Sequence, residues 1–364
     1  MSVAALRSPA TWGRRGAVAA LTVAALAATV VLGAAFPGSP AGTAVDVLFA
    51  TGTLASALRL SVPIALAALG GIFAEKSGVI NIGLEGLLIL SAFSAVYATD
   101  VTGSLWVGVA AGVASSVLLA ALFGVVCIEF RADQIIAGLA VWLIALGLGP
   151  FAAQVVYDAP NSDSVRTPPT LLGLVGDVPL LGDALGALAG VRFVGALFDA
   201  GPFVYLTLGL VALSWYTVNR TRFGRWVEAS GENPKALDTA GVNVARVRYA
   251  AVLLSGALSG LGGAALSLEL GQFTGNGPTM VNGKGFIAIV AYLFGNYSPV
   301  GAFLSTLLFA GLDAVQTALQ LEDVGLPNPL IRIIPFVTVV VVLALVGGTR
   351  LPEAAGEHYE SGED

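Results

Sequence analysis

Long apolar windows, separated by polar or Gly/Pro-rich breaks, recur along almost the whole chain and constrain its fold more than any other feature. Most are close to the ~20 residues that a helix needs to cross the ~30 Å hydrocarbon core of a bilayer. Because lipid offers the backbone no hydrogen-bond partner, such windows predict helices. We predict ten membrane spans, at residues 16–36, 48–72, 79–99, 104–128, 134–156, 203–219, 248–270, 285–297, 300–320 and 331–348. The predicted fold class is an all-α polytopic membrane protein, in which the short eighth window is a broken or tilted helix.

The composition supports a membrane protein and excludes several kinds of site. Hydrophobic residues make up 56% of the 364 residues and charged residues 11%, whereas a soluble domain carries about 25% charged residues. The one cysteine (Cys127) and the one histidine (His358) exclude a disulfide framework and a His/Cys metal site. The 46 glycines fit membrane helices that pack closely through small residues. We therefore expect no metal and no cofactor.

The basic residues predict the orientation of the chain in the membrane. With a cytoplasmic N-terminus, twelve of the seventeen Lys and Arg residues lie inside, Arg166 and Arg192 lie outside, and three fall within spans or at their edges. This asymmetry follows the positive-inside rule. Both termini are therefore predicted to be cytoplasmic. The predicted divisions are a cytoplasmic N-terminus (1–15), a transmembrane domain whose first helix is not cleaved (16–348) and an acidic cytoplasmic tail (349–364).

Two connections between the predicted spans are much longer than the others. Residues 157–202 form an outer segment with five Asp residues and many Gly and Pro residues. This segment either carries a short surface helix or is merely solvated. Residues 220–247 form a large inner loop, which is the better candidate for a functional role.

The inner loop carries the signals of a short helix. Asn233 is a good N-cap, Pro234 suits the first helical position, and Gly241 suits the left-handed position after the end. These signals predict a helix from Pro234 to Ala240, which is too short to be stable unless it packs against something. Two interpretations stay open. The helix either lies on its own bundle or forms a peg that docks into a cytoplasmic partner.

A polar pair opens the third apolar window. Asn81 and Glu85 lie one helical turn apart in GVINIGLEG, although an ionisable group near the bilayer centre costs roughly 2.5–3.5 kcal/mol on insertion scales. The glycines around Gly78 predict a broken helix start, which a membrane tolerates only where protein or a cavity surrounds it. Three interpretations stay open: the pair lines a substrate path, other groups of the protein satisfy it, such as Lys76 or Ser and Thr hydroxyls, or the span itself is misplaced.

A second set of residues echoes this pair. INIGLEGLLIL has a counterpart in VNGKGFIAIV about 200 residues later, and the chain direction is reversed between matching helices, as in inverted-repeat transporters. We therefore expect an inverted repeat, with Asn282 and Phe286 as the mirrored path positions. Trp142 could stack against a flat ligand together with Phe286, although an aromatic residue on a membrane helix usually only packs.

The sequence holds no motif for enzyme chemistry. GPTMVNGKG (277–285) is one residue too long for a phosphate-binding loop and has Gly instead of Ser or Thr after Lys284. The chain also lacks a nucleophile elbow and an acid/base pair in a predicted aqueous pocket. We therefore expect no catalytic residues.

Three stretches resemble the permease subunits of ABC importers for nucleosides, ribose-type sugars and branched-chain amino acids. They are LSVPIALAALGGIFAEKSGVINIGLEGLLILSAF, EASGENPKALDTAGVNVARVRYAAVLLSGALSGLGGA and NGKGFIAIVAYLFGNYSPVGAFLSTLLFAG. They are distributed over residues 48–348, and EKSGVINIGLEG is most similar to one of the two unlike permeases of nucleoside importers. The sequence departs from the pattern at GNYSP (295–299), where relatives tend to carry a basic and an aromatic residue, and in the long 157–202 segment.

The resemblance implies a non-enzymatic permease in the plasma membrane that carries a nucleoside or a simple sugar by alternating access. It implies a second, unlike permease subunit, two cytoplasmic ATPase subunits and an extracytoplasmic substrate-binding lipoprotein as partners, and no nucleic acid. The predicted short helix would be the coupling helix, with the coupling residues Glu232, Asn233, Pro234, Lys235, Asp238 and Gly241. The path positions would be Asn81, Glu85, Asn282, Phe286 and Trp142.

Two rival functions remain open on the sequence. A stand-alone secondary carrier for a small polar solute would need an intramembrane proton or sodium relay, which Glu85 and Glu269 could supply. A scaffold membrane protein would tolerate replacement of Asn81, Glu85 and the 234–240 helix. Retention of an ATPase subunit on purification distinguishes the three functions.

Overall fold

The computed structural model describes residues 39–178, 181–191, 194–322 and 350–360 as continuous stretches, with isolated residues between 31 and 36 and between 327 and 337. The chain in these stretches is helical, and its only β pairing is an isolated bridge between Asn161 and Thr274. The predicted all-α class is confirmed for this part of the chain.

Within the described residues, six helices are long and apolar enough to cross a membrane, and each coincides with a predicted span. They are α3 (Thr51–Lys76), α4 (Leu84–Thr102), α5 (Leu105–Gly124) continued by the π-helical turn η2 (Val125–Glu129), α6 (Gln134–Tyr157), α12 (Val244–Leu270) and α14 (Pro299–Leu321). The short apolar helix α13 (Lys284–Phe294) has 11 residues. It confirms that the eighth window is too short for an ordinary spanning helix.

The remaining three predicted spans are not confirmed as membrane-spanning helices. The window 203–219 is a helix, α9 (Pro202–Arg220), but α9 is not among the six helices that are long and apolar enough to cross a membrane. The windows 16–36 and 331–348 lie outside the described residues. The total of ten spans therefore stays a prediction.

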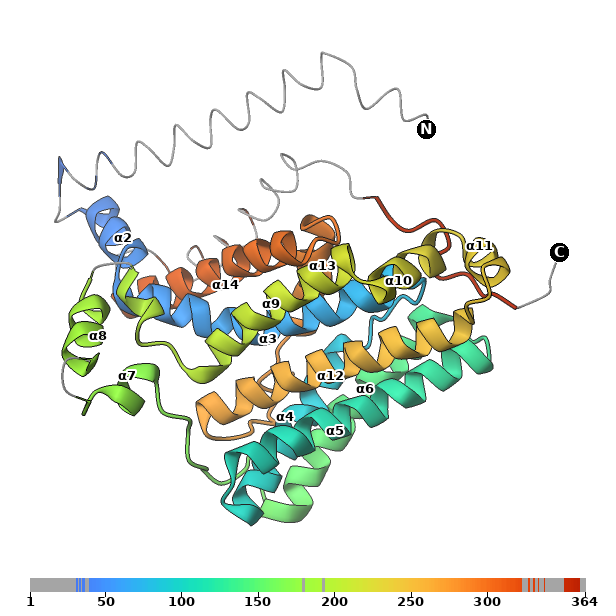
Figure 1. Ribbon diagram of the computed structural model, residues 1–364. Coiled ribbons are helices and arrows are strands. Elements are labelled where there is room, and N and C mark those ends of the chain that lie inside the picture. Colours follow the sequence, from blue (N-terminus) through green and yellow to red (C-terminus); the bar gives the residue numbers. More distant parts are fainter. Residues whose placement is uncertain are drawn as a thin grey trace.

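α3 and α12 form the centre of the bundle (Figure 1). α3 packs against α12, α13 and α14, whereas α12 packs also against α4 and α5, and α6 lies on α4. Glycines allow these close crossings. A Cβ atom on Gly70 of α3 would lie 2.8 Å from the Ser255 carbonyl oxygen of α12, and one on Gly263 of α12 would lie 2.3 Å from the Leu88 carbonyl oxygen of α4. This is the small-residue packing by which membrane helices associate.

The outer helices turn large apolar side chains away from the bundle. Leu118 on α5, Ile136 on α6 and Leu304 on α14 are 72%, 68% and 60% exposed. A soluble protein rarely exposes a contiguous apolar surface of this kind, whereas lipid solvates it well. These faces fit a protein whose surroundings are a bilayer.

Short helices lie at both ends of the bundle (Figure 1). At one end, the 157–202 segment carries α7 (Leu171–Val175), α8 (Leu181–Ala189) and the 3-10 turn η3 (Val194–Leu197), near α2 (Pro40–Leu48). The alternative of short surface helices in this segment is thereby confirmed. At the opposite end lie α10 (Arg222–Glu232) and α11 (Pro234–Thr239). These are named below the α8 end and the α11 end.

Candidate functional site

The turn between α3 and α4 brings Asn81 into the interior. Gly78 has a φ of +93°, and the chain from there to Gly83 runs without helix before α4 begins. Asn81 is 2% exposed, and its Oδ1 atom accepts a hydrogen bond from the Gly83 N–H at 3.0 Å. Its Nδ2 atom donates to Ser255 Oγ on α12 at 3.3 Å. The broken helix start that the glycines predicted is confirmed, and Asn81 ties it to α12.

Glu85, in the first turn of α4, caps the start of another helix. Glu85 is 2% exposed, and its carboxylate accepts hydrogen bonds from the Gly283 and Gly285 N–H groups at 2.7 and 2.6 Å. These groups belong to the N-terminus of α13, where backbone donors lack partners within the helix and the helix dipole favours negative charge. A Cβ atom on Gly285 would lie 2.3 Å from the Glu85 backbone nitrogen. The N-termini of α4 and α13 therefore meet through one carboxylate.

The partners of this polar pair are partly the predicted ones. Lys76 does not neutralise Glu85, because its Nζ atom pairs with Glu228 at 3.0 Å. A serine hydroxyl, that of Ser255, does contact Asn81, as one interpretation of the sequence expected. These contacts support structural pairing in the described conformation. That Asn81 and Glu85 also face a substrate path stays a prediction.

Trp142 and Phe286 meet beside the same junction. Their rings lie edge to face, with centroids 5.4 Å apart and planes at 83°. Both side chains are half-buried, one from α6 and one from α13. α6 also approaches α4 closely, because a Cβ atom on Gly86 would lie 2.9 Å from the Trp142 Cα atom. Asn282 directly precedes Gly283, is exposed and has a φ of +45°. Four predicted path positions thus gather around the start of α13: Glu85, Trp142, Asn282 and Phe286.

Two residues that the sequence did not single out complete the junction. Gln134, at the start of α6, accepts a hydrogen bond from the Ile80 N–H at 2.7 Å, and its side chain is buried. Ser255 is the partner of Asn81 on α12. Gln134 could have been found from the sequence, because it is a polar residue at the edge of an apolar window. Ser255 could not, because a serine within a helix of small residues is not a distinctive feature.

α11 has the local structure that its sequence predicted. The Asn233 side chain accepts from the Ala236 N–H at 3.0 Å, Pro234 occupies the first turn, and Gly241 has a φ of +80°. Leu237 is the buried residue of this six-residue helix. α11 therefore rests on the bundle through one apolar side chain and presents most of its surface outwards.

The other predicted coupling residues surround α11. Glu232 and Lys235 are exposed, and Asp238 accepts a hydrogen bond from the Tyr359 hydroxyl at 2.9 Å. Residues 232–235 and the tail line a cleft of about 670 Å³. The six predicted coupling positions therefore lie together at the α11 end.

A tyrosine of the α13–α14 turn lies near this end as well. Tyr297 is buried, and its burial together with the Glu75 carboxylate raises the pKa of its hydroxyl. The ring packs 5.7 Å from the ring of Tyr292. Tyr297 therefore stays protonated and serves as a packing residue. Among the described residues, no group of three or more His, Cys, Asp or Glu side chains is arranged to hold a metal ion.

Comparisons with known proteins agree on one kind of protein. Residues 53–343 match the family model described as "branched-chain amino acid transport system / permease component". The chain is 32% identical over 319 residues to the guanosine ABC transporter permease protein NupQ of Bacillus subtilis, which covers 84% of this chain and 95% of that protein. It is 33% identical over 321 residues to the nucleoside ABC transporter permease protein NupC of Lactococcus lactis, covering 84% and 96%.

More distant similarity extends to sugar transport. The ribose import permease protein RbsC of Escherichia coli is 28% identical over 226 residues, or 61% of this chain and 62% of that protein. No solved structure matches the chain.

Proposed function

Because the chain belongs to the family of permease components of branched-chain amino acid transport systems, we propose that it is one membrane subunit of an ATP-driven importer for nucleosides. It is a multi-pass protein of the plasma membrane. Two relatives that match most of its length are named as ABC transporter permeases for guanosine or nucleosides. A simple sugar is the second substrate class, since a ribose permease is a more distant relative.

The single observation that carries the proposal is the exposed, lightly packed structure of α11. A helix of six residues is too short to be stable alone, and only Leu237 of its residues is buried, yet its N-cap is formed and its outer surface is exposed. This construction suits a helix that completes its packing in a partner. We propose that α11 is the coupling helix, that Glu232, Asn233, Pro234, Lys235, Asp238 and Gly241 form the docking surface, and that the partner is an ATPase subunit.

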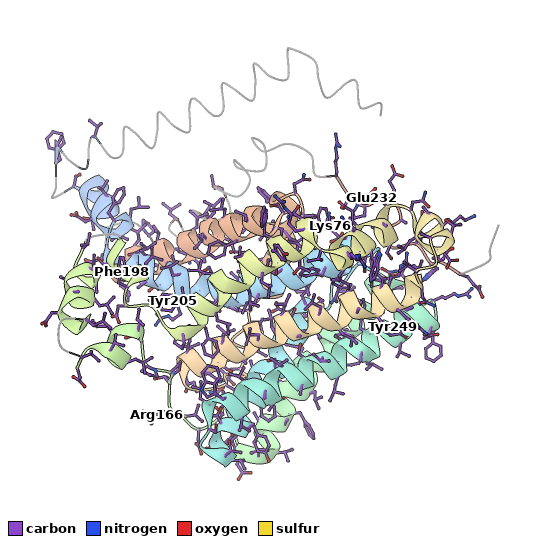
Figure 2. The ribbon with its side chains drawn as sticks, in the orientation of Figure 1. Lys76, Arg166, Phe198, Tyr205, Glu232 and Tyr249 are labelled. Carbon is purple, nitrogen blue, oxygen red and sulfur yellow. The ribbon has the colours of Figure 1, made fainter. Side chains whose placement is uncertain are left out.

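The distribution of charge supports a cytoplasmic α11 end. Basic residues gather there, including Lys76 at the end of α3, whereas Arg166 lies in the 157–202 segment towards the α8 end (Figure 2). The positive-inside rule then favours a cytoplasmic α11 end and cytoplasmic termini. The α8 end would face outwards and receive the nucleoside from an extracytoplasmic binding protein, which we propose to be a lipoprotein.

We propose that the path runs beside the junction of α4, α6 and α13. Asn282 is exposed there, and the half-buried rings of Trp142 and Phe286 offer apolar faces to a nucleobase. Asn81 and Glu85 would hold the two helix starts in register from behind this surface. In alternating access, α4 and α13 would then move as one unit, since the Glu85 carboxylate joins them.

The pairs of helices that pack together agree with an inverted repeat. α3 packs on α14 as α12 packs on α5, and α4 packs on α12 as α13 packs on α3. We propose that α3, α4 and α5 correspond to α12, α13 and α14. A second, unlike permease subunit would complete the membrane part of the transporter.

The stand-alone carrier is less well supported. Both carboxylate oxygens of Glu85 are occupied by backbone N–H groups. Glu269 lies 14 residues beyond Ser255, the α12 partner of Asn81, which corresponds to ~21 Å along a helix. The two glutamates therefore do not form a direct proton relay.

The test is co-purification of the permease with the ATPase subunit produced from the same set of genes. We expect the wild type to retain the ATPase, and the Lys235→Glu variant to lose about five- to tenfold in affinity, or about 1–1.4 kcal/mol. Arg166→Glu is the matched control, because it reverses an exposed positive charge in the 157–202 segment. Equal retention by the two variants would contradict docking through α11. ATP-independent uptake by the permease alone would instead favour the secondary carrier.

A further inference from the structure

Residues 350–360 cross the α11 end and are held there by bonds to several turns of the bundle (Figure 1). We call this segment the C-terminal strap. The sequence predicted only an acidic tail in solvent, yet Ala354 is 5% exposed. The strap is therefore a packed part of the structure.

Backbone bonds fix the strap to the α3–α4 turn and to the end of α10. The Gly356 N–H donates to the Gly78 carbonyl oxygen at 3.0 Å, and the Ala354 N–H donates to the Gly231 carbonyl oxygen at 2.8 Å. Gly356 has a φ of +82°, and a Cβ atom there would lie 3.1 Å from the Ile80 side chain. This fit depends on a residue without a side chain, in a backbone conformation that glycine adopts freely.

A buried arginine supports the same contact. Arg248 of α12 is 5% exposed, and its Nη1 atom donates to the Glu357 carbonyl oxygen at 2.8 Å. A Cβ atom on Gly78 would lie 2.9 Å from Arg248 Nη2. The guanidinium therefore lies between the strap and the α3–α4 turn and touches both.

Side chains fix the far part of the strap to other elements. The Tyr359 hydroxyl donates to Asp238 Oδ2 on α11 at 2.9 Å. Glu360 forms an ion pair with Arg131, in the turn between η2 and α6. Gly356 and Tyr359 are three residues apart, so the chain between them spans ~10 Å at most. The strap is thus a short connection from α11 to the turn at which α4 begins.

We propose that the C-terminal strap is a positioning element that transmits displacement of α11 to the α3–α4 turn, and through it to Asn81 and Glu85. The inference rests on the proposed coupling role of α11. α10 touches the same turn, since Ser230 Oγ donates to the Ser77 carbonyl oxygen at 2.8 Å. α10 also joins α11 directly through Asn233. The strap provides a second connection, through the hydrogen bond from Tyr359 to α11.

The experiment measures nucleoside uptake per ATP hydrolysed by the assembled transporter in proteoliposomes. Tyr359→Phe removes the hydroxyl that binds Asp238, and Glu360→Gln removes the charge that pairs with Arg131. We expect Tyr359→Phe to lower uptake per ATP by about two- to tenfold, and Glu360→Gln, which opens a half-exposed ion pair, to lower it by about twofold. Neither variant should lower the amount of bound ATPase. Glu353→Gln is the matched control, because this exposed residue of the same segment takes part in none of these contacts.

A charge swap separates positioning from general damage. Arg131→Glu alone should behave as Glu360→Gln does, and the double variant Arg131→Glu/Glu360→Arg should recover most of the uptake per ATP. If Tyr359→Phe and Glu360→Gln match the wild type and Glu353→Gln, the strap transmits nothing and the inference is wrong.

Hydrogen exchange tests the strap without any ATPase. In the permease alone, Tyr359→Phe should accelerate amide exchange at Gly356 and in residues 78–83, and unchanged exchange there would overturn the connection. A wild type that neither retains an ATPase nor transports with ATP would refute the proposed function instead. The two failures are therefore distinguishable.

Discussion

The α4–α13 junction and the α11 end are built by opposite means. At the junction, a buried carboxylate is held by two backbone N–H groups, those of Gly283 and Gly285, and glycine is required for the close approach. At the α11 end, a six-residue helix has one buried side chain and is held in part by the Tyr359 hydroxyl. Backbone partners keep one geometry, whereas a lightly packed helix can shift with a partner. The first region therefore suits a fixed joint between α4 and α13, and the second suits the coupling role proposed for α11.

The largest expected effect is that of Gly285→Ala. The added methyl group would lie 2.3 Å from the Glu85 backbone nitrogen, which cannot rotate away. We expect a loss of about 3 kcal/mol or more in the free energy of unfolding and loss of uptake. Thermal unfolding in detergent measures the stability. Gly311→Ala on α14 is the control, since a Cβ atom there meets nothing within 4 Å. Equal stability of the two variants would show that the junction is not tightly packed.

Glu85→Gln should have the next largest effect. The amide keeps the shape of the side chain but replaces an acceptor by an NH₂ group, which would face a backbone N–H of α13. We expect a loss of about 2 kcal/mol in stability, because a charge-assisted bond is removed and a buried donor is left without a partner. Glu85→Asp, which keeps the charge but shortens the reach, should also destabilise. A wild-type melting temperature in Glu85→Gln would contradict the capping role.

Asn233→Ala should affect coupling more than folding. It removes the side-chain cap of α11, which is worth about 1 kcal/mol to that helix. Because α11 contributes little to the core, we expect lower uptake per ATP with an almost unchanged melting temperature. Asn243→Ala removes the equivalent cap of the long helix α12 and should lower the melting temperature instead. The opposite pattern would contradict the view that α11 is lightly packed and acts in coupling.

The smallest expected effect is that of Glu228→Gln. Lys76 and Glu228 form an ion pair at 3.0 Å, but the Glu228 side chain is 53% exposed. Exposed pairs contribute about 0–1 kcal/mol and are screened by salt. We expect a change of less than about 0.5 kcal/mol in stability, measured at low and high salt. A drop as large as that of Glu85→Gln would mean that exposure does not separate the two regions.

The sequence predicted the features that depend on neighbouring residues. α11 could be located to within one residue, since Asn233, Pro234 and Gly241 act on the backbone beside them. The membrane helices followed from window length and hydropathy, and the broken start of α4 followed from its glycines. Such signals are local and need no knowledge of the fold.

The partners of the polar residues could not be predicted in the same way. Glu85 binds groups 198 and 200 residues later in the chain, and Arg131 pairs with a residue 229 positions away. Helix packing, and not the local sequence pattern, decides which residues meet across such long separations in the chain. The glycines on either side of Lys284 were the available signal for the contact with Glu85. The tail gave no such signal for the Arg131 pair, because Glu360 is one of several acidic residues there.

The most direct test of the coupling account is labelling of the Lys235→Cys variant with a membrane-impermeant thiol reagent. Cys127 is the only native cysteine and is buried, so the parent protein supplies the background. We expect labelling in inside-out vesicles, no labelling in intact cells, and protection when the ATPase subunit is bound. Labelling from outside the intact cell would place α11 on the wrong side of the membrane for an ATPase and would contradict the account.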